Sequence, residues 1–492
     1  MESLRTRDLN GRRVVVWGFG TEGRAAVTLL QRHCRPASLD VVVDSGATAV
    51  SDPTVNVTYG AAASRIVAAA EVIVKSPGVS PYVGVLADSK TSAVITGGTA
   101  LWFAETGGAN TIAVTGSKGK STTSSLIAHF LVALARPTTL AGNVGRALLD
   151  VLDEELSAAQ TPSSHAPTNA DALPMTDALP MTDAPPMTDA LPMTYALELS
   201  SFQSAEVRHS PTVGVLTALF PEHLDWHGSV ERYYADKCNL FAHGSSTPLV
   251  ANFDNANVVE QCGARLLGAP TVVPYGVSGG VHLRGPLVIG PDGYDVLDLT
   301  NSTLVGRHNA INICGALSAL RAYGIDLVEH RQALQAAVET FVPLEHRLQP
   351  VGYHRNRLVI DDSLSTAPQA AVAALAAFAD RPVGIIVGGH DRGLDYTPLA
   401  EALAARTTPT WVLGVPMSGE RIVPLIQSAL AAAATKTVVV EAFDDFDAAV
   451  ARASDVVPEG GVLLLSPAAP SFGRFQNYHD RGLHFRALLG LN

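Results

Sequence analysis

Cysteine is scarce in this chain of 492 residues. The four cysteines are widely separated, at Cys34, Cys238, Cys262 and Cys314. They form no Cys-x-x-Cys pair and have no zinc-ligand spacing, which argues against a disulfide-stabilised scaffold and a cysteine zinc site. We expect four reduced thiols in a cytoplasmic protein.

Long apolar runs and excess positive charge are also missing. No segment approaches the ~20 apolar residues of a membrane span, and the first apolar stretch, Val14 to Trp17, is too short for a signal peptide. The formal net charge is −12, so neither nucleic acid nor an anionic membrane is predicted as a partner. We expect a soluble protein in which a few Lys or Arg residues can still form a phosphate pocket.

Apolar residues make up 47% of the chain, enough for large hydrophobic cores. Short apolar runs alternate with helical patterns, which is typical of parallel βαβ units. The runs lie at Arg13–Trp17, Leu39–Asp44, Val72–Val74, Thr111–Val114, Tyr195–Leu199, Thr212–Leu216, Arg357–Ile360, Gly384–Gly389, Trp411–Gly414 and Gly461–Ser466. We predict an α/β protein with a Rossmann-like domain at 1–98, a P-loop ATPase-like domain at 99–342 and a Rossmann-like domain at 343–492.

A low-complexity insertion interrupts the central domain at about 156–194. Residues 171–194 read DALPMT, DALPMT, DAPPMT, DALPMT. Proline at every sixth residue forbids a helix, so we predict a flexible surface segment, with docking of a partner as the alternative.

The first glycine loop, Gly18-Phe19-Gly20-Thr21-Glu22-Gly23, follows a predicted strand and opens a predicted helix. Asp44 follows about twenty residues later, as in dinucleotide-binding fingerprints. The motif indicates a diphosphate site more firmly than it identifies the ligand. These residues alone leave three interpretations of the loop open: binding of an NAD-type cofactor, binding of another nucleotide diphosphate, or mere tight packing.

The second glycine loop, Thr115-Gly116-Ser117-Lys118-Gly119-Lys120-Ser121-Thr122, is more specific, and we call it the phosphate loop. Its glycines free backbone N–H groups for phosphate, Lys120 brings positive charge, and Ser121 or Thr122 offers a hydroxyl to Mg²⁺. Val114 replaces the first glycine of the usual pattern. The loop predicts ATP or GTP.

Three further residues are candidates for the chemistry. Glu198 ends a predicted strand, where a parallel sheet collects its ligands. His223 lies in Pro221-Glu222-His223-Leu224-Asp225-Trp226-His227 after the next strand, and a metal or the substrate is its predicted partner. Without further information, we expect Lys237 to be a solvated lysine on the surface of a helix.

Twelve segments in one order resemble the Mur ligases, over nearly the whole chain except the insertion. The segments are VVVWGFGTEG, KSPGVS, VTGSKGKSTT, AGNVG, LELSSFQ, EHLDWHG, ADKCNLF, GRHNAINI, EHRLQPV, DDSLSTAP, GGHDRG and LLLSPAAPSFGRFQNY. Within the family they resemble the branch that adds D-glutamate to UDP-N-acetylmuramoyl-L-alanine in peptidoglycan synthesis.

The resemblance implies a role for each motif. The first loop would hold UDP rather than a nicotinamide, and the residues implied for the UDP substrate are Gly20, Thr21, Glu22, Asp44, Ser45, Gly78, Asn143 and His223. Besides the phosphate loop, Asn309, Arg347 and Asp362 would hold ATP. Two Mg²⁺ sites would use Ser121 with Glu198 and His223 with a carbamylated Lys237. The D-glutamate pocket would contain Thr366, Arg392, Ser471, Phe472 and Tyr478.

Several positions depart from the family pattern. Leu364 stands where relatives often carry a lysine, and Arg392 replaces a lysine, which keeps the charge but changes its geometry. Phe472 and Tyr478 also differ modestly from the common residues.

The implied reaction activates a carboxylate by phosphoryl transfer from ATP, with Lys120, Glu198, His223 and Lys237 as catalytic residues. The resulting acyl phosphate then reacts with the amine of D-glutamate. The resemblance also implies a monomer whose third domain closes over the second. The alternatives are a sister ligase with another amino acid, a nicotinamide oxidoreductase, and a nucleotide-binding regulator without turnover.

Overall fold

The computed structural model describes residues 3–43, 54–59, 63–88, 91–160, 191–244, 247–265 and 271–491. The chain divides into two compact units. The first comprises 1–282, 290–294 and 314–334, and the second comprises 283–289, 295–313 and 335–492. The predicted division into three domains stays a prediction, although each of the three large sheets lies within one predicted range.

The first sheet is parallel, with the strand order β3-β2-β1-β4-β5 that a Rossmann-like domain predicts. Its strands are β1 (Arg13–Trp17), β2 (Ser38–Val43), β3 (Asn56–Tyr59), β4 (Val72–Lys75) and β5 (Val94–Gly97). Its connecting helices are α1 (Thr21–His33), α2 (Ala63–Ala69) and α3 (Val85–Asp88), and η1 (Thr6–Leu9) precedes β1. Both faces of β1 are buried, because Val14 and Val16 enter one core while Val15 and Trp17 enter another. A strand buried on both faces reads as a continuous apolar run.

The second sheet is also parallel, in the order β11-β10-β9-β6-β8-β7. Its strands are β6 (Thr111–Thr115), β7 (Thr138–Gly142), β8 (Thr194–Glu198), β9 (Val213–Leu216), β10 (Leu249–Asn252) and β11 (Val272–Tyr275). The helical elements of this region are α4 (Gly98–Thr106), α5 (Lys120–Ala133), α6 (Leu148–Gln160), α7 (Ser201–Ser204), α8 (Leu224–His227), α9 (Val230–Cys238), η3 (Asn239–Phe241) and α10 (Ala256–Arg265). The neighbours of β6 are β8 and β9, so the segments that follow these three strands meet at one edge.

A small sheet and two helices follow. The sheet contains β12 (His282–Arg284), β13 (Leu287–Ile289) and β14 (Asp295–Asp298), and the helices are α11 (Arg307–Ala322) and α12 (Arg331–Thr340).

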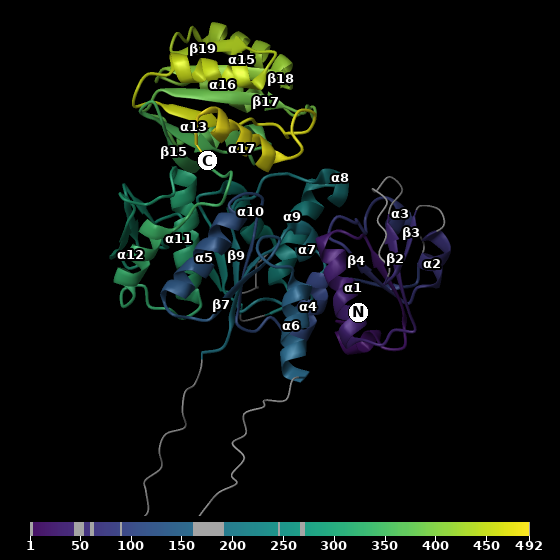
Figure 1. The fold of residues 1–492 in the computed structure, drawn as a ribbon. Coiled ribbons are helices and arrows are strands. Elements are labelled where there is room, and N and C mark those ends of the chain that lie inside the picture. The colour runs from purple at the N-terminus through teal and green to yellow at the C-terminus, as the bar shows by residue number, and fades with distance from the viewer. Residues whose placement is uncertain are drawn as a thin grey trace, which may run out of the picture. The chain divides into compact units, whose positions relative to one another are not determined.

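The last sheet lies in the second unit, in the order β15-β16-β20-β17-β18-β19. Strand β15 is antiparallel to β16, and the other pairs are parallel. The strands are β15 (Gln349–His354), β16 (Arg357–Asp361), β17 (Val383–Gly389), β18 (Thr410–Met417), β19 (Val438–Ala442) and β20 (Val462–Leu465). Helices α13 (Pro368–Ala376), α14 (Thr397–Ala404) and α15 (Gly419–Ala433) contribute to one core, and α16 (Phe446–Val456) and α17 (Tyr478–Leu488) contribute to another. The sheet therefore carries helices on both faces (Figure 1).

Some of the predicted features lie partly or wholly outside the described residues. Asp44, Ser45 and most of the repeat lie outside them. Helix α6 continues to Gln160, past the predicted start of the insertion at about 156, and β8 begins at Thr194. Within the described ranges, no helix combines the length and apolarity that a membrane crossing requires.

Candidate active site

The phosphate loop joins β6 to α5 and exposes backbone donors. Gly116 has a φ of 144° and Gly119 a φ of 88°, a region that side chains rarely adopt. A Cβ on Gly116 would also collide with the Thr217 hydroxyl. Gly119 is the N-cap of α5 and supplies no capping side chain, so the first N–H groups of this helix can bind an anion.

The polar side chains of the phosphate loop have different partners. Ser117 is buried, and its Oγ lies 2.7 Å from the Tyr233 hydroxyl and accepts a hydrogen bond of 2.8 Å from the Phe220 N–H. Lys118 forms an ion pair of 2.6 Å with Glu222. Lys120 Nζ instead donates to the Ser117 carbonyl at 3.0 Å. Lys120 therefore lies across the loop, whereas Lys118 points to a surface carboxylate.

Glu198 ends β8 beside the phosphate loop and is almost completely buried. Its Oε1 accepts a hydrogen bond of 2.8 Å from the Asn143 amide. Its Oε2 is buried without a hydrogen-bond partner among the described residues. A buried carboxylate oxygen without a partner is costly, and a cation is the ligand that would satisfy it.

Lys237, in the last turn of α9, is only 2% exposed, so the default expectation of a solvated lysine is wrong. Its Nζ donates to the Gly116 carbonyl at 2.6 Å and lies 4.9 Å from the centre of the Tyr233 ring. It forms no ion pair with a carboxylate of the described residues. Burial, followed by repulsion from Lys120, lowers the pKa of Lys237 well below its usual value.

His223 precedes α8 in a left-handed conformation with a φ of 53°. The residue is largely exposed, and its ring centre lies 5.0 Å from that of Phe202. Desolvation by the surrounding protein lowers the pKa of His223, and Lys237 and Lys120 add repulsion although Glu222 opposes them. The imidazole therefore favours its neutral form, which can ligate a metal.

A buried hydrogen-bond chain supports this edge of the sheet and was missed by sequence reasoning. His227 Nδ1 lies 2.6 Å from Asp236 Oδ2, and its Nε2 lies 2.9 Å from the Ser201 hydroxyl. Asp236 also accepts a hydrogen bond of 3.0 Å from the Tyr82 hydroxyl. The chain fixes α7, α8 and α9 around Lys237. In the sequence, His227 and Asp236 stand among other charged and polar residues, so nothing local identifies them as buried or as partners.

The first glycine loop has the conformation of a diphosphate site. Gly18 has a φ of 93°, and a Cβ there would lie 2.7 Å from the Ser76 hydroxyl. A Cβ on Gly23 would collide with the Gly18 carbonyl. A Cβ added to Gly20, the N-cap of α1, would have no neighbouring atom within 4 Å. The same holds for Gly78 in the turn after β4. The geometry of the three loop glycines thus matches the usual division into a tight turn, an open approach for a ligand, and helix packing.

Glu22, in the first turn of α1, contacts helix α7. Its Oε1 accepts a hydrogen bond of 3.2 Å from the Gln203 amide. Burial, with repulsion from Asp150, raises the pKa of Glu22 to about 7. Thr21 is exposed beside it.

The residues expected to bind ATP are divided between the two units. The phosphate loop belongs to the first unit, and Asn309, Arg347 and Asp362 belong to the second. Asp362 is buried and accepts hydrogen bonds from the Ser466 hydroxyl at 2.6 Å and the Leu348 N–H at 3.1 Å. Burial raises the pKa of Asp362 to about 7. Asn309 donates to the Val305 carbonyl at 2.8 Å.

Four of the residues expected to bind glutamate occupy three loops of the second unit, and the fifth, Tyr478, begins α17. Arg392 and Phe472 are exposed, Ser471 is buried, and Thr366 is partly buried. The loops are joined by the His390 N–H, which donates to the Pro470 carbonyl at 2.8 Å, and by the Ser363 hydroxyl, which donates to the Tyr478 carbonyl at 2.7 Å.

A buried arginine that sequence reasoning missed connects two of these loops. Arg481 is 2% exposed, and its guanidinium donates to the carbonyls of Ser363 at 2.8 Å and Ala469 at 3.0 Å. Burial lowers the pKa of Arg481 to about 10. An arginine in a polar helix gives no local signal of burial, because its partners lie far away in the sequence.

Comparison with known families matches two regions. Residues 114–320 match the Mur ligase middle domain, and residues 346–469 match the domain described as Mur ligase, glutamate ligase domain.

Curated relatives share most of the chain. A protein of Micromonospora sp. (strain ATCC 39149) is 42% identical and one of Salinispora tropica is 41% identical, and both comparisons cover 97% of this chain and at least 96% of the relative. A protein of Xanthomonas euvesicatoria is 37% identical over 99% of this chain and 97% of its own length. All three are named UDP-N-acetylmuramoyl-L-alanine–L-glutamate ligase.

Solved structures share the fold at low sequence identity. MurF from Acinetobacter baumannii has a TM-score of 0.54 at 14% identity, covering 94% of this chain and 90% of the other. MurF ligase from Thermotoga maritima, solved in complex with ADP, has a TM-score of 0.52 at 14% identity, covering 99% and 96%.

Proposed function

Because the chain belongs to the Mur ligase family, we propose that it is an ATP-dependent amide ligase of peptidoglycan synthesis. Its acceptor would be UDP-N-acetylmuramoyl-L-alanine and its amino acid glutamate, as in the names of the relatives. The observation that carries the proposal is the meeting of the phosphate loop, Glu198 and Lys237 at one edge of the central sheet. The protein would act as a cytoplasmic monomer.

We propose L-glutamate as the amino acid. The sequence resemblance implies D-glutamate, but the relatives at 37–42% identity are named for L-glutamate. Arg392, Phe472 and Tyr478, which depart from the expected pattern, all lie in the proposed amino-acid pocket. A changed pocket is consistent with the opposite configuration at the α-carbon.

The proposed reaction has two steps. The terminal carboxylate oxygen of the acceptor attacks the γ-phosphorus of ATP, so ADP leaves and an acyl phosphate forms. The amine of glutamate then attacks the acyl carbon, loses a proton and expels phosphate. The N–H groups at the start of α5 and the Lys120 ammonium would stabilise the negative charge of the transferring phosphoryl group.

The residues beside the phosphate loop fit Mg²⁺. Glu198 Oε2 is a buried carboxylate oxygen without a partner among the described residues, and Ser121 lies in the first turn of α5, which packs on the same strand. Mg²⁺ prefers oxygen ligands of this kind. Ser121 and Glu198 would hold one ion, and His223 and Lys237 a second. When bound, Mg²⁺ neutralises charge on the phosphates.

Lys237 would become a metal ligand by carbamylation. An ammonium cannot ligate a cation, whereas the carbamate formed from the amine and CO₂, with loss of a proton, is an anion with two oxygens. The burial of Lys237 without a carboxylate ion pair in the described residues favours the neutral amine that this reaction needs.

The test compares two lysines of the phosphate loop. ADP formation should require both UDP-N-acetylmuramoyl-L-alanine and glutamate. Lys120→Ala should lower kcat by about three orders of magnitude, because a charge that stabilises the transition state is lost. Lys118→Ala, which removes an ion pair with Glu222, should lose much less. ATP turnover that is indifferent to glutamate, or equal losses in the two variants, would contradict the proposal.

A further inference from the structure

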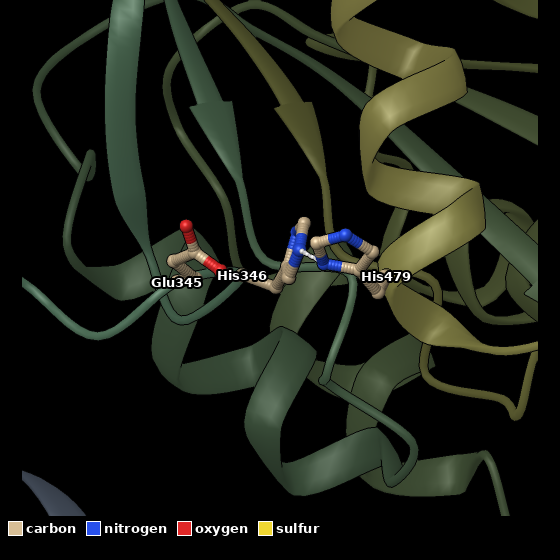
Figure 2. Close-up of side chains that lie close together, drawn as sticks. All are labelled: Glu345, His346 and His479. Atoms are coloured by element: carbon tan, nitrogen blue, oxygen red, sulfur yellow. Dashed lines mark hydrogen bonds between the residues drawn. The ribbon is translucent and has the colours of Figure 1, made fainter.

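Three side chains of the second unit converge away from the phosphate loop. Glu345 and His346 lie between α12 and β15, and His479 lies in the first turn of α17. One ligand atom from each lies within 4.8 Å of the others, and no other such group occurs among the described residues. Figure 2 shows the two imidazole rings side by side and joined by a hydrogen bond, with their planes perpendicular, and Glu345 on the same loop as His346.

His346 is held in one orientation by a buried carboxylate. Its Nδ1 lies 2.7 Å from Asp361 Oδ2, and both side chains are at most 1% exposed. Asp361 also accepts hydrogen bonds from Arg486 Nε at 2.8 Å and from the Ser363 N–H at 3.0 Å. An ionised carboxylate can only accept, so a neutral His346 carries its proton on Nδ1 and its lone pair on Nε2.

The second ring nitrogen of His346 points at His479. His346 Nε2 lies 2.8 Å from His479 Nδ1, and with neutral His346 the hydrogen bond runs from His479 Nδ1–H to this nitrogen. A carboxylate that orients a histidine through one ring nitrogen, and leaves the other nitrogen for a cation, is the usual support of a metal-binding histidine.

We propose that Glu345, His346 and His479 form a binding site for a transition-metal dication such as Zn²⁺. Two imidazole nitrogens and one carboxylate are typical zinc ligands, whereas Mg²⁺ and Ca²⁺ take oxygen ligands. Water would complete the coordination.

Only a small movement is needed for binding. With Zn–N distances of about 2.0–2.1 Å and tetrahedral angles, the two nitrogens would separate to roughly 3.3 Å. His479 is exposed and can make this movement, while His346 stays fixed on Asp361. The proton on Nδ1 of His479 would move to its Nε2. The metal would then tie the loop that carries Arg347 to the start of α17.

The test is a Zn²⁺ titration of the full chain by calorimetry, without ATP and with excess Mg²⁺ to occupy oxygen-rich sites. His479→Gln keeps a hydrogen-bonding group but removes the imidazole, and it should weaken Zn²⁺ binding by about 100-fold. Glu345→Gln should weaken binding by at least about 10-fold, because the loss of a group that merely supports a metal ligand already costs about 10- to 100-fold. The matched control is His484→Gln on the same helix, whose ring contacts Asp447 at 2.7 Å, and it should bind like wild type.

A second readout identifies the ligands. Co²⁺ substituted into the wild type should give the visible absorption of a four-coordinate site, and His479→Gln should lack that absorption. The proposal is overturned if His479→Gln binds Zn²⁺ as tightly as the wild type does. It is also overturned if the wild type binds no more Zn²⁺ than His479→Gln does. In either case the two histidines serve only as a hydrogen-bonded pair.

Discussion

At the scale of single residues, burial changes the chemistry of groups that the sequence presents as ordinary. Lys237 and Glu198 are both nearly inaccessible, yet neither has an ion-pair partner of opposite charge among the described residues. The helix lysine has no local sequence signal for this, whereas the apolar run around Glu198 argues against a surface position. Their burial follows from the packing of β6, β8 and α9, which only the fold brings together.

Glu22 provides a prediction for the pH dependence of stability. Its pKa is about 7 in the folded protein against an ordinary value of 4.5, so the folded state binds more protons between these values. The free energy of unfolding should therefore fall as pH rises from about 4.5 to 7, by at most about 3 kcal/mol, and stay low above pH 7. Glu22→Gln should lack this contribution and be the more stable protein at pH 8. Urea denaturation at pH 5 and pH 8 measures the difference.

The control for Glu22 is Glu329→Gln, which neutralises an exposed carboxylate of the same unit. It should keep the pH dependence of the wild type. An unchanged pH dependence in Glu22→Gln would show that this carboxyl does not hold its proton in the folded state.

At the scale of elements, strands and loops were the most predictable parts. The predicted run Arg13–Trp17 coincides with β1, and Thr111–Val114 is β6 without its last residue. Apolar runs between glycine-rich turns predict buried parallel strands well, because both faces of such strands are covered. The contacts of His346 with Asp361 and of Arg481 with Ala469 were not predictable, since they join residues whose spacing carries no pattern.

Two of the three glycines of the first loop, Gly18 and Gly20, give predictions that can be tested separately. Gly18→Ala should destabilise the protein by about 1–3 kcal/mol, because it adopts a φ of 93° and a Cβ would contact Ser76. Gly20→Ala should cost less than about 1 kcal/mol, because Gly20 has a φ of −77° and open space around it. Gly20→Ala should also weaken binding of the UDP substrate more than 10-fold if the diphosphate approaches the backbone of Gly20.

Denaturation and a titration with UDP-N-acetylmuramoyl-L-alanine separate the two effects. Unaltered binding in a well-folded Gly20→Ala variant would place the diphosphate elsewhere.

At the scale of the whole molecule, the first unit contains both glycine loops that are expected to bind phosphate. The buried pair of Lys75 and Glu206 and the hydrogen bond from Tyr82 to Asp236 connect the first sheet to the segments around Lys237. The second unit contains the residues expected to bind the amino acid. The order of motifs predicted the family and its fold. The configuration of the amino acid would depend on side-chain geometry in the proposed pocket, which motif order does not encode.

The most direct test of the central claim is the product of one competition reaction. The chain is incubated with ATP, Mg²⁺, UDP-N-acetylmuramoyl-L-alanine and equal amounts of isotopically heavy L-glutamate and light D-glutamate. Mass spectrometry should find the amide product with the heavy label, in amounts equal to the ADP formed. A light product would contradict the choice of L-glutamate, and ADP without any amide product would contradict the ligase itself.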